Sequence, residues 1–208
     1  MITIGILASH EGTTCQAVLD ACKSETLSAQ VGIVISNNRD SGALRRAQAA
    51  GVPVAHLSGQ NHPDAESLDA AICTSLQRHN VDIVLLAGYM KKLGTKTLCA
   101  FRNRILNTHP ALLPKYGGKG MYGLRVHQAV LDSAESITGV TVHLVDEEYD
   151  TGPIIAQCLV PVIPGDSYET LAARVQQRER EFVVEVLSGI AGKTIHLPDL
   201  APSGNSNI

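Results

Sequence analysis

The apolar run ILNTHP, residues 105–110, contains two polar side chains, Asn107 and His109, two positions apart. In an extended strand both side chains project from the same face, about 6.6 Å apart along the strand. Pro110 cannot donate a ladder hydrogen bond and is expected to end the strand. An amide donor beside an imidazole can stabilise a developing oxyanion and move a proton. A structural asparagine in a turn and a hydrogen-bonded core histidine would give the same pattern.

An acidic loop, residues 146–150 (DEEYD), is the second candidate, with four carboxylates in five residues. A carboxylate that reaches His109 would raise the pKa of its imidazole and make the imidazolium available near neutral pH. The spacing does not say which carboxylate does this, and a solvated acidic turn is the simpler interpretation for the others. No metal is expected, since the histidines show no HxH or HxxxH pairing and the loop lacks EF-hand ligand spacing.

The third candidate is the segment ASHEGTT, residues 8–14, which leaves the first strand and opens a helix. Free N–H groups of the first helical turn, the positive end of the helix dipole and two hydroxyls suit a phosphate. The segment is neither G-x-G-x-x-G nor a P-loop, so a dinucleotide or nucleoside triphosphate is not indicated. A plain N-cap by Thr13 or Thr14 is equally compatible.

The elements that must position these residues alternate between short β-branched runs and longer helical patterns in the first half of the chain. This alternation predicts an α/β fold, a Rossmann-like, mostly parallel sheet with helices on both faces. Ligands gather at the carboxyl ends of strands in such sheets. Strands are expected at 2–7, 31–36, 53–57 and 82–88, and helices at 13–24, 40–50, 64–80 and 94–101.

The pattern changes after Pro110. A glycine-rich stretch at 115–123 is either a mobile lid or a plain crossover loop. A helix near 125–134 and two strands at 137–145 and 154–162, antiparallel additions to the sheet, are expected next. A last helix opens at Asp166-Ser167 and runs to Gly189, and the Pro/Gly-rich tail is expected to fray.

Composition narrows the class of protein. The chain has 208 residues, enough for one domain with a C-terminal extension. A formal net charge of -3 leaves no basic surplus, so nucleic acid is a poor candidate partner and small molecules are favoured. Five cysteines without CxxC spacing suggest reduced thiols. With neither a signal-peptide pattern nor a membrane-spanning apolar run, a cytoplasmic location is expected.

Taken together, three motifs resemble the formyltetrahydrofolate-dependent formyltransferases. They are NTHPALLP at 107–114, GVTVH at 139–143 and DTGPII at 150–155, and the resemblance covers about residues 1–190. It implies one formyltransferase domain at 1–190, with a nucleotide-binding half at 1–102, a catalytic and folate-binding half at 103–190, and a tail at 191–208.

The resemblance implies 10-formyltetrahydrofolate as the formyl donor, a small-molecule amine as the acceptor, no metal, and a monomer or homodimer. Family members of this length without an added domain formylate glycinamide ribonucleotide in purine biosynthesis. A formyltransferase acting on another amine, such as an amino sugar nucleotide, is the alternative. An inactive folate-binding protein is a less favoured one.

Roles for individual residues follow from the same resemblance. Asn107 and protonated His109 would stabilise the oxyanion of a tetrahedral intermediate. Asp150 would set the charge on His109 and carry a proton through an ordered water. The other implied contacts are Gly12, Thr13 and Thr14 with the acceptor phosphate, Glu179 with its ribose hydroxyls, and Met90, Lys91, Lys92, Leu93, Asn107, Val145, Asp146 and Asp150 with the folate.

Three departures from the family pattern concern binding rather than transfer. Residues 12–14 are Gly-Thr-Thr where Gly-Ser-Asn is usual, and Glu11 adds a negative charge beside the expected phosphate. The segment 59–67 lacks an expected arginine. Lys91 and Lys92 stand where an arginine followed by an apolar residue is common, so a fork-shaped donor becomes a point charge.

Overall fold

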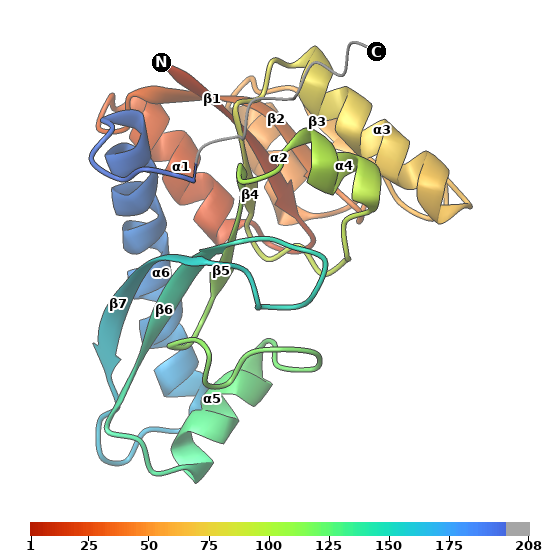
Figure 1. Ribbon diagram of the computed structural model, residues 1–208. Helices are drawn as coiled ribbons and strands as arrows, with labels where there is room; N and C mark the ends of the chain where they lie inside the picture. Colours follow the sequence, from red (N-terminus) through yellow and green to blue (C-terminus); the bar gives the residue numbers. More distant parts are fainter. Residues whose placement is uncertain (199–208) are drawn as a thin grey trace, which may run out of the picture.

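The computed structural model describes residues 1–198, and its strands form one mixed sheet. Within this part of the chain seven strands lie in the order β3-β2-β1-β4-β5-β6-β7 (Figure 1). The strands are β1 (Ile2–Ala8), β2 (Ala29–Ser36), β3 (Val54–His56), β4 (Ile83–Leu86), β5 (Ile105–His109), β6 (Ile137–Leu144) and β7 (Ile154–Pro161). The helices are α1 (Thr13–Lys23), α2 (Gly42–Ala49), α3 (Ala65–Arg78), α4 (Thr95–Ala100), α5 (Leu124–Asp132) and α6 (Tyr168–Ala191).

The sheet changes from parallel to antiparallel at β5. Strands β1 to β5 pair in parallel, whereas β6 runs antiparallel to β5 and β7 antiparallel to β6. The direction of winding reverses between β1 and β4, since β2 and β3 extend the sheet on one side of that pair and β5 on the other. Ligands bind at the carboxyl ends of strands beside such a reversal. The predicted fold class is confirmed.

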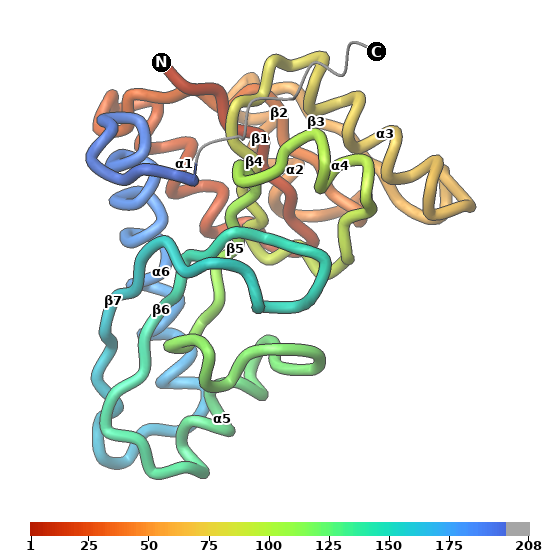
Figure 2. Tube along the Cα trace, viewed as in Figure 1, coloured from red at the N-terminus to blue at the C-terminus, as the bar shows by residue number. Residues whose placement is uncertain are grey.

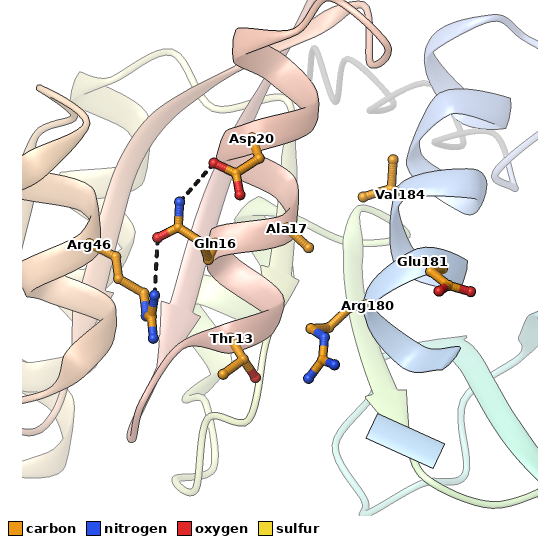
Figure 3. A pocket seen from close by; sticks show the side chains of 8 residues that line it. All are labelled: Thr13, Gln16, Ala17, Asp20, Arg46, Arg180, Glu181 and Val184. Carbon is orange, nitrogen blue, oxygen red and sulfur yellow. Dashed lines mark hydrogen bonds between the residues drawn. The ribbon is translucent and has the colours of Figure 1, made fainter. Parts of the chain in front are cut away.

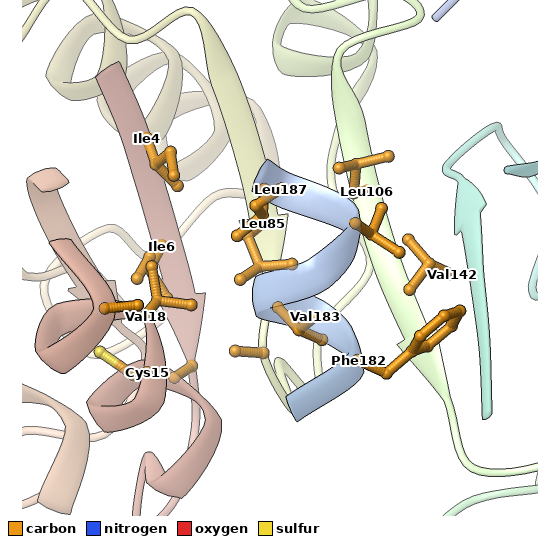
Figure 4. Packing of buried hydrophobic residues seen from close by; sticks show 14 of the residues in the cluster. Ile4, Ile6, Cys15, Val18, Leu85, Leu106, Val142, Phe182, Val183 and Leu187 are labelled. Carbon is orange, nitrogen blue, oxygen red and sulfur yellow. The ribbon is translucent and has the colours of Figure 1, made fainter. Parts of the chain in front are cut away.

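Helices cover both faces of the sheet. On one face Ile6 and Leu106 belong to a core cluster that also contains residues of α1, α2, α5 and α6, such as Val183 of α6 (Figure 4). On the other face Leu7 packs with Leu76 of α3. Neighbouring residues of β1 therefore face opposite cores, which is why the strand is apolar at nearly every position instead of at every second one.

Of the six helices in residues 1–198, three begin at a side-chain cap and three at a glycine. Ser41, Asp64 and Ser167 cap α2, α3 and α6 with side-chain oxygens that accept backbone N–H groups. Helix α1 begins differently, because its N-cap is Gly12 in the left-handed region (φ 69°) with no side-chain cap bond. A Cβ at this position would lie 2.6 Å from the Cα of Ala43, so the close approach of α2 also requires glycine.

The observed elements differ from the expected ones mainly at their ends. The strand expected at 82–88 stops at Leu86, because the chain turns at Gly88 with φ 70°. Helix α6 continues two residues past Gly189 to Ala191. Of the expected tail, residues 199–208 lie outside the described residues. Among residues 1–198, no helix combines the length and the apolar composition needed to cross a membrane.

Candidate active site

Strand β5 delivers Asn107 and His109 to the carboxyl edge of the sheet and ends at His109, as the sequence predicts. The antiparallel partner β6 places His143 opposite Asn107 and Thr141 opposite His109. Residues directly opposite each other in an antiparallel pair lie on the same face of the sheet. The edge therefore gathers an amide and two imidazoles on one face.

The orientation of Asn107 is set by His143. The Nδ1 of His143 donates to the backbone oxygen of Leu144 at 2.8 Å, which leaves its Nε2 to accept from Asn107 Nδ2 at 3.1 Å. The second N–H of the Asn107 amide stays available for a ligand oxygen. His143 belongs to a quoted motif, but sequence reasoning did not assign it to the site. The register of the antiparallel β5–β6 pair, which sets His143 opposite Asn107, is the signal that would have identified it.

Asp150 is the carboxylate of the acidic loop that reaches His109. Its Oδ2 lies 3.5 Å from His109 Nδ1, and its Oδ1 lies 3.5 Å from His143 Nε2. The backbone N–H of Gly118 donates to Oδ2 at 2.9 Å. The structure thus brings Asn107, His109 and Asp150 together, with His143 between the amide and the carboxylate.

Burial dominates the protonation of His109, which is 3% exposed. Desolvation lowers the pKa of its imidazole below the ordinary value, while Asp150 and the Tyr116 carbonyl, which accepts from Nε2 at 2.7 Å, act to raise it. The imidazolium expected near neutral pH is therefore not the favoured form in this structure. Asp150 acts in the predicted direction, but burial outweighs it.

The carboxyl group of Asp150 shows the opposite balance. Burial raises its pKa, but the Gly118 N–H, which donates to Oδ2, and the nearby charge of His109 act to lower it, and the pKa lies below its usual range. Asp150 is therefore a carboxylate near neutral pH, able to stabilise a cation or accept a proton.

The turn expected to hold the acceptor phosphate, residues 11–14 and called the acceptor turn below, leads from β1 into α1. Neither Thr13 nor Thr14 caps α1, so the alternative of a plain threonine cap is wrong. The Oε2 of Glu11 lies 4.0 Å from Arg45 on α2, with both side chains exposed, and Arg46 Nε donates to the Glu11 backbone oxygen at 2.8 Å. The negative charge of Glu11 is thus directed towards α2.

Glu179 on α6 connects this turn to β5. One of its oxygens, Oε1, accepts from Thr108 Oγ1 at 2.8 Å and from Thr14 Oγ1 at 3.3 Å. Burial raises the pKa of Glu179, while the two hydroxyls act to lower it. Thr108, which sequence reasoning did not assign to the site, lies between Asn107 and His109 in the chain. These two hydrogen bonds to Glu179, called the bridge below, therefore connect the acceptor turn to the residue between Asn107 and His109.

Two cavities lie near these groups. The larger, of 520 Å³, runs between α1 and α6 and is bordered by Thr13, Arg46 and Arg180 (Figure 3). The smaller, of 360 Å³, is lined by Asp150 together with apolar side chains such as Leu113. Only the smaller one is bordered by a member of the amide, imidazole and carboxylate group, so we assign the chemistry to its side of the sheet edge.

The residues expected to bind the formyl donor lie on two loops that touch. Lys92 Nζ is 3.7 Å from Glu148 Oε1 and 5.7 Å from the centre of the Tyr149 ring. Met90 and Lys91 are exposed, whereas the side chain of Leu93 is packed in the core on the α3 side. Residues 90–93, called the donor segment below, are therefore anchored at one end and open at the other.

At the start of the acidic loop, Asp146 and the preceding Val145 support the position of Asp150. Val145 N donates to the backbone oxygen of Ile105 at 2.9 Å, which extends the β5–β6 pairing. Asp146 Oδ1 accepts from Thr151 Oγ1 at 2.8 Å and so holds the turn that follows Asp150.

The glycine-rich stretch at 115–123 packs on the His109–Asp150 pair through the Tyr116 carbonyl and the Gly118 N–H. Figure 2 shows it projecting in the same direction as the loop between β6 and β7. Movement of this stretch as a lid stays a prediction.

Comparison with known proteins agrees with this geometry. The formyl transferase family matches residues 2–187. Phosphoribosylglycinamide formyltransferase of Haemophilus influenzae is 38% identical over 199 residues, covering 96% of this chain and 92% of the relative. The chloroplastic phosphoribosylglycinamide formyltransferase of Arabidopsis thaliana is 38% identical over 193 residues, covering 92% of this chain. The chain spans 66% of the length of this plant relative and 62% of that from Vigna unguiculata.

Solved structures show the same arrangement of elements. The crystal structure of glycinamide ribonucleotide transformylase 1 from Symbiobacterium toebii has a TM-score of 0.87 at 38% identity and covers 96% of this chain and 95% of that one. The corresponding enzyme from Geobacillus kaustophilus has a TM-score of 0.84 at 36% identity and covers 91% and 98%. An amide, an imidazole and a carboxylate at the strand ends of an α/β sheet can stabilise an oxyanion and move a proton. The chain belongs to the formyl transferase family.

Proposed function

We propose that this chain transfers the formyl group of 10-formyltetrahydrofolate to the amine of glycinamide ribonucleotide, a step of de novo purine biosynthesis. The observation that carries the proposal is the meeting of Asn107, His109 and Asp150 at the end of β5. The bacterial relatives that this chain matches over nearly their whole length bear the name of this activity, which supports the choice of acceptor.

Asn107 and His109 stabilise the charge that develops on the formyl oxygen. Asn107 donates the N–H that His143 does not use, and His109 donates from Nδ1 when protonated. Burial disfavours the imidazolium, so it forms as negative charge builds on the formyl oxygen beside it, with Asp150 adding to the effect. Loss of one such donor lowers turnover on the order of 10²–10³-fold.

Asp150 moves the proton. When the acceptor amine attacks the formyl carbon, a new C–N bond forms and the nitrogen becomes acidic. The Asp150 carboxylate accepts this proton through an ordered water and returns it to N10 of the folate as the bond from N10 to the formyl carbon breaks. The low pKa of Asp150 keeps it ionised for this role.

The acceptor is held on the other side of β5. Gly12, Thr13 and Thr14 bind its phosphate through the first-turn N–H groups of α1, which lack a side-chain cap. Glu179 accepts from the ribose hydroxyls, oriented by its bonds to Thr108 and Thr14.

The donor is bound by Met90, Lys91, Lys92 and Leu93 on one side and by Asn107, Val145, Asp146 and Asp150 on the other. The contact of Lys92 with Glu148 brings these two sides together. In this division residues 1–102 supply the acceptor phosphate site and residues 103–190 supply the catalytic groups. The boundary expected at residue 191 coincides with the last residue of α6, and Ile195 and Leu197 beyond it pack against the core.

An acceptor-dependence assay tests the proposal. Purified protein with 10-formyltetrahydrofolate should release tetrahydrofolate only when glycinamide ribonucleotide is added, and the product should carry the formyl group. An amino sugar nucleotide added in its place serves as the comparison. Donor turnover that does not respond to glycinamide ribonucleotide, or that responds better to the amino sugar nucleotide, would refute the proposed acceptor.

A further inference from the structure

Ser9 is a buried residue that follows β1 and is 3% exposed. Its hydroxyl donates to Asn37 Oδ1 at 2.6 Å and accepts from the Met90 N–H at 2.8 Å. Its own N–H donates to the backbone oxygen of Gly88 at 3.1 Å. One residue thus ties together the chain segments that leave β1, β2 and β4.

These contacts lie where the winding of the sheet reverses. Strands β1 and β4 are neighbours, and the strand order turns around between them. The crevice at the carboxyl ends of such a pair is where α/β sheets bind ligands. On the β1 side the chain continues three residues later into Gly12, and on the β4 side it continues into the donor segment.

We propose that Ser9 is a positioning residue that sets the donor segment (residues 90–93) against the acceptor turn (residues 11–14). The inference rests on the proposed function, which assigns the formyl donor to the first segment and the acceptor phosphate to the second. Its physical basis is separate, because the Ser9 hydroxyl accepts directly from the Met90 backbone and so holds the first residue of the donor segment.

The surroundings of Met90 indicate what loss of this hydroxyl does. A buried N–H without an acceptor is costly, so the group moves to water where it can. Met90 is 42% exposed and follows the left-handed turn at Gly88, so the donor segment can shift outwards. Displacement of this segment, not unfolding of the sheet, is therefore the expected response.

The test compares Ser9→Ala with a matched control, Ser36→Ala. Ser36 is also a buried serine at the end of a neighbouring strand, but its hydroxyl accepts from Asn38 N and does not touch the donor segment. Ser9→Ala should raise the KM for 10-formyltetrahydrofolate about tenfold and leave kcat and the acceptor KM within about twofold. Ser36→Ala should leave the donor KM unchanged. Equal donor KM values in the two variants, or an equal loss of kcat in both, would overturn the proposal.

Amide hydrogen exchange provides a readout that does not depend on activity, and its wild-type part does not depend on a folded variant. The Met90 N–H of the wild-type protein should be protected although its side chain is exposed, and in Ser9→Ala it should exchange faster while the amides of β1 keep their protection. A wild-type Met90 amide that exchanges at the rate of an open loop would contradict the inference. Failure of the acceptor-dependence assay would reject the proposed function but would leave this exchange pattern unchanged.

Discussion

Replacement of Thr108 by valine removes one hydroxyl from the bridge between β5, α1 and α6 and leaves the shape of the side chain almost unchanged. Thr108 Oγ1 donates to Glu179 Oε1 at 2.8 Å, and Thr14 Oγ1 donates to the same oxygen at 3.3 Å. In the variant the carboxylate keeps only the longer of these two bonds. Burial already raises the pKa of Glu179, so its ionised form becomes harder to maintain.

The size of the effect follows from the type of bond. A hydrogen bond to a charged group contributes about 1.5–3 kcal/mol. The Thr14 bond remains and Glu179 is partly exposed, so the lower end of this range applies. A loss of about 1.5 kcal/mol corresponds to roughly a tenfold fall in kcat/KM for the acceptor. The donor KM should not change, because Thr108 faces away from Asn107 and His109 on β5.

The pH dependence adds a second readout. Ionised Glu179 is the form that accepts from acceptor hydroxyls, so kcat/KM for the acceptor should rise as pH rises through the pKa of Glu179. Loss of a hydroxyl that lowers this pKa should move the midpoint of the rise to higher pH in Thr108→Val. Steady-state kinetics with glycinamide ribonucleotide between pH 5 and pH 9, the ordinary working range of such assays, would measure both effects.

A matched control is Thr138→Val on β6. The Thr138 hydroxyl is buried and has no hydrogen-bond partner in the described part of the chain, so its removal should leave acceptor kinetics unchanged. Acceptor kinetics in Thr108→Val that equal those of the wild type, or a donor KM that rises as much as the acceptor KM, would refute the role assigned to the bridge.

Three further changes test other parts of the structure. Asp69 is 5% exposed and accepts three backbone N–H groups at the start of α4, so Asp69→Ala should lower the free energy of unfolding in urea by about 2 kcal/mol. A Cβ at Gly152 would collide with the backbone oxygen of Leu144, so Gly152→Ala should shift the acidic loop and reduce kcat about 10²-fold, measured against an unchanged circular dichroism spectrum. The pKa of Asp150 is lower in the folded than in the unfolded state, so its ionisation stabilises the fold above the unfolded-state pKa, and this stabilisation is lost as pH falls through the folded-state pKa. Any stability advantage of wild type over Asp150→Asn at pH 7 should therefore shrink below about pH 4 in urea titrations.

The sequence is most informative where a single strand decides the geometry. Asn107 and His109 share a face because alternate residues of a strand do so, and Pro110 marks the end of the strand. The alternation of strands and helices is sufficient to predict a parallel sheet covered on both faces. The choice of Asp150 among four carboxylates came from family resemblance, because loop spacing does not determine which side chain turns towards His109.

The parts that could not be predicted depend on contacts between distant segments. His143 reaches Asn107 through the register of β5 and β6, which an apolar pattern does not fix. Ser9 meets Met90 across 81 positions of sequence, and Thr108 meets Glu179 across 71. The lowered pKa of His109 arises from burial, which no local motif reports.

The most direct test of the account is the rate of formyl transfer in single turnover for Asn107→Ala, His109→Ala and Asp150→Asn. Saturating 10-formyltetrahydrofolate and glycinamide ribonucleotide separate chemistry from binding. The account predicts a fall on the order of 10²–10³-fold for Asn107→Ala and His109→Ala and of 10²–10⁴-fold for Asp150→Asn. Transfer at the wild-type rate in all three folded variants would contradict it.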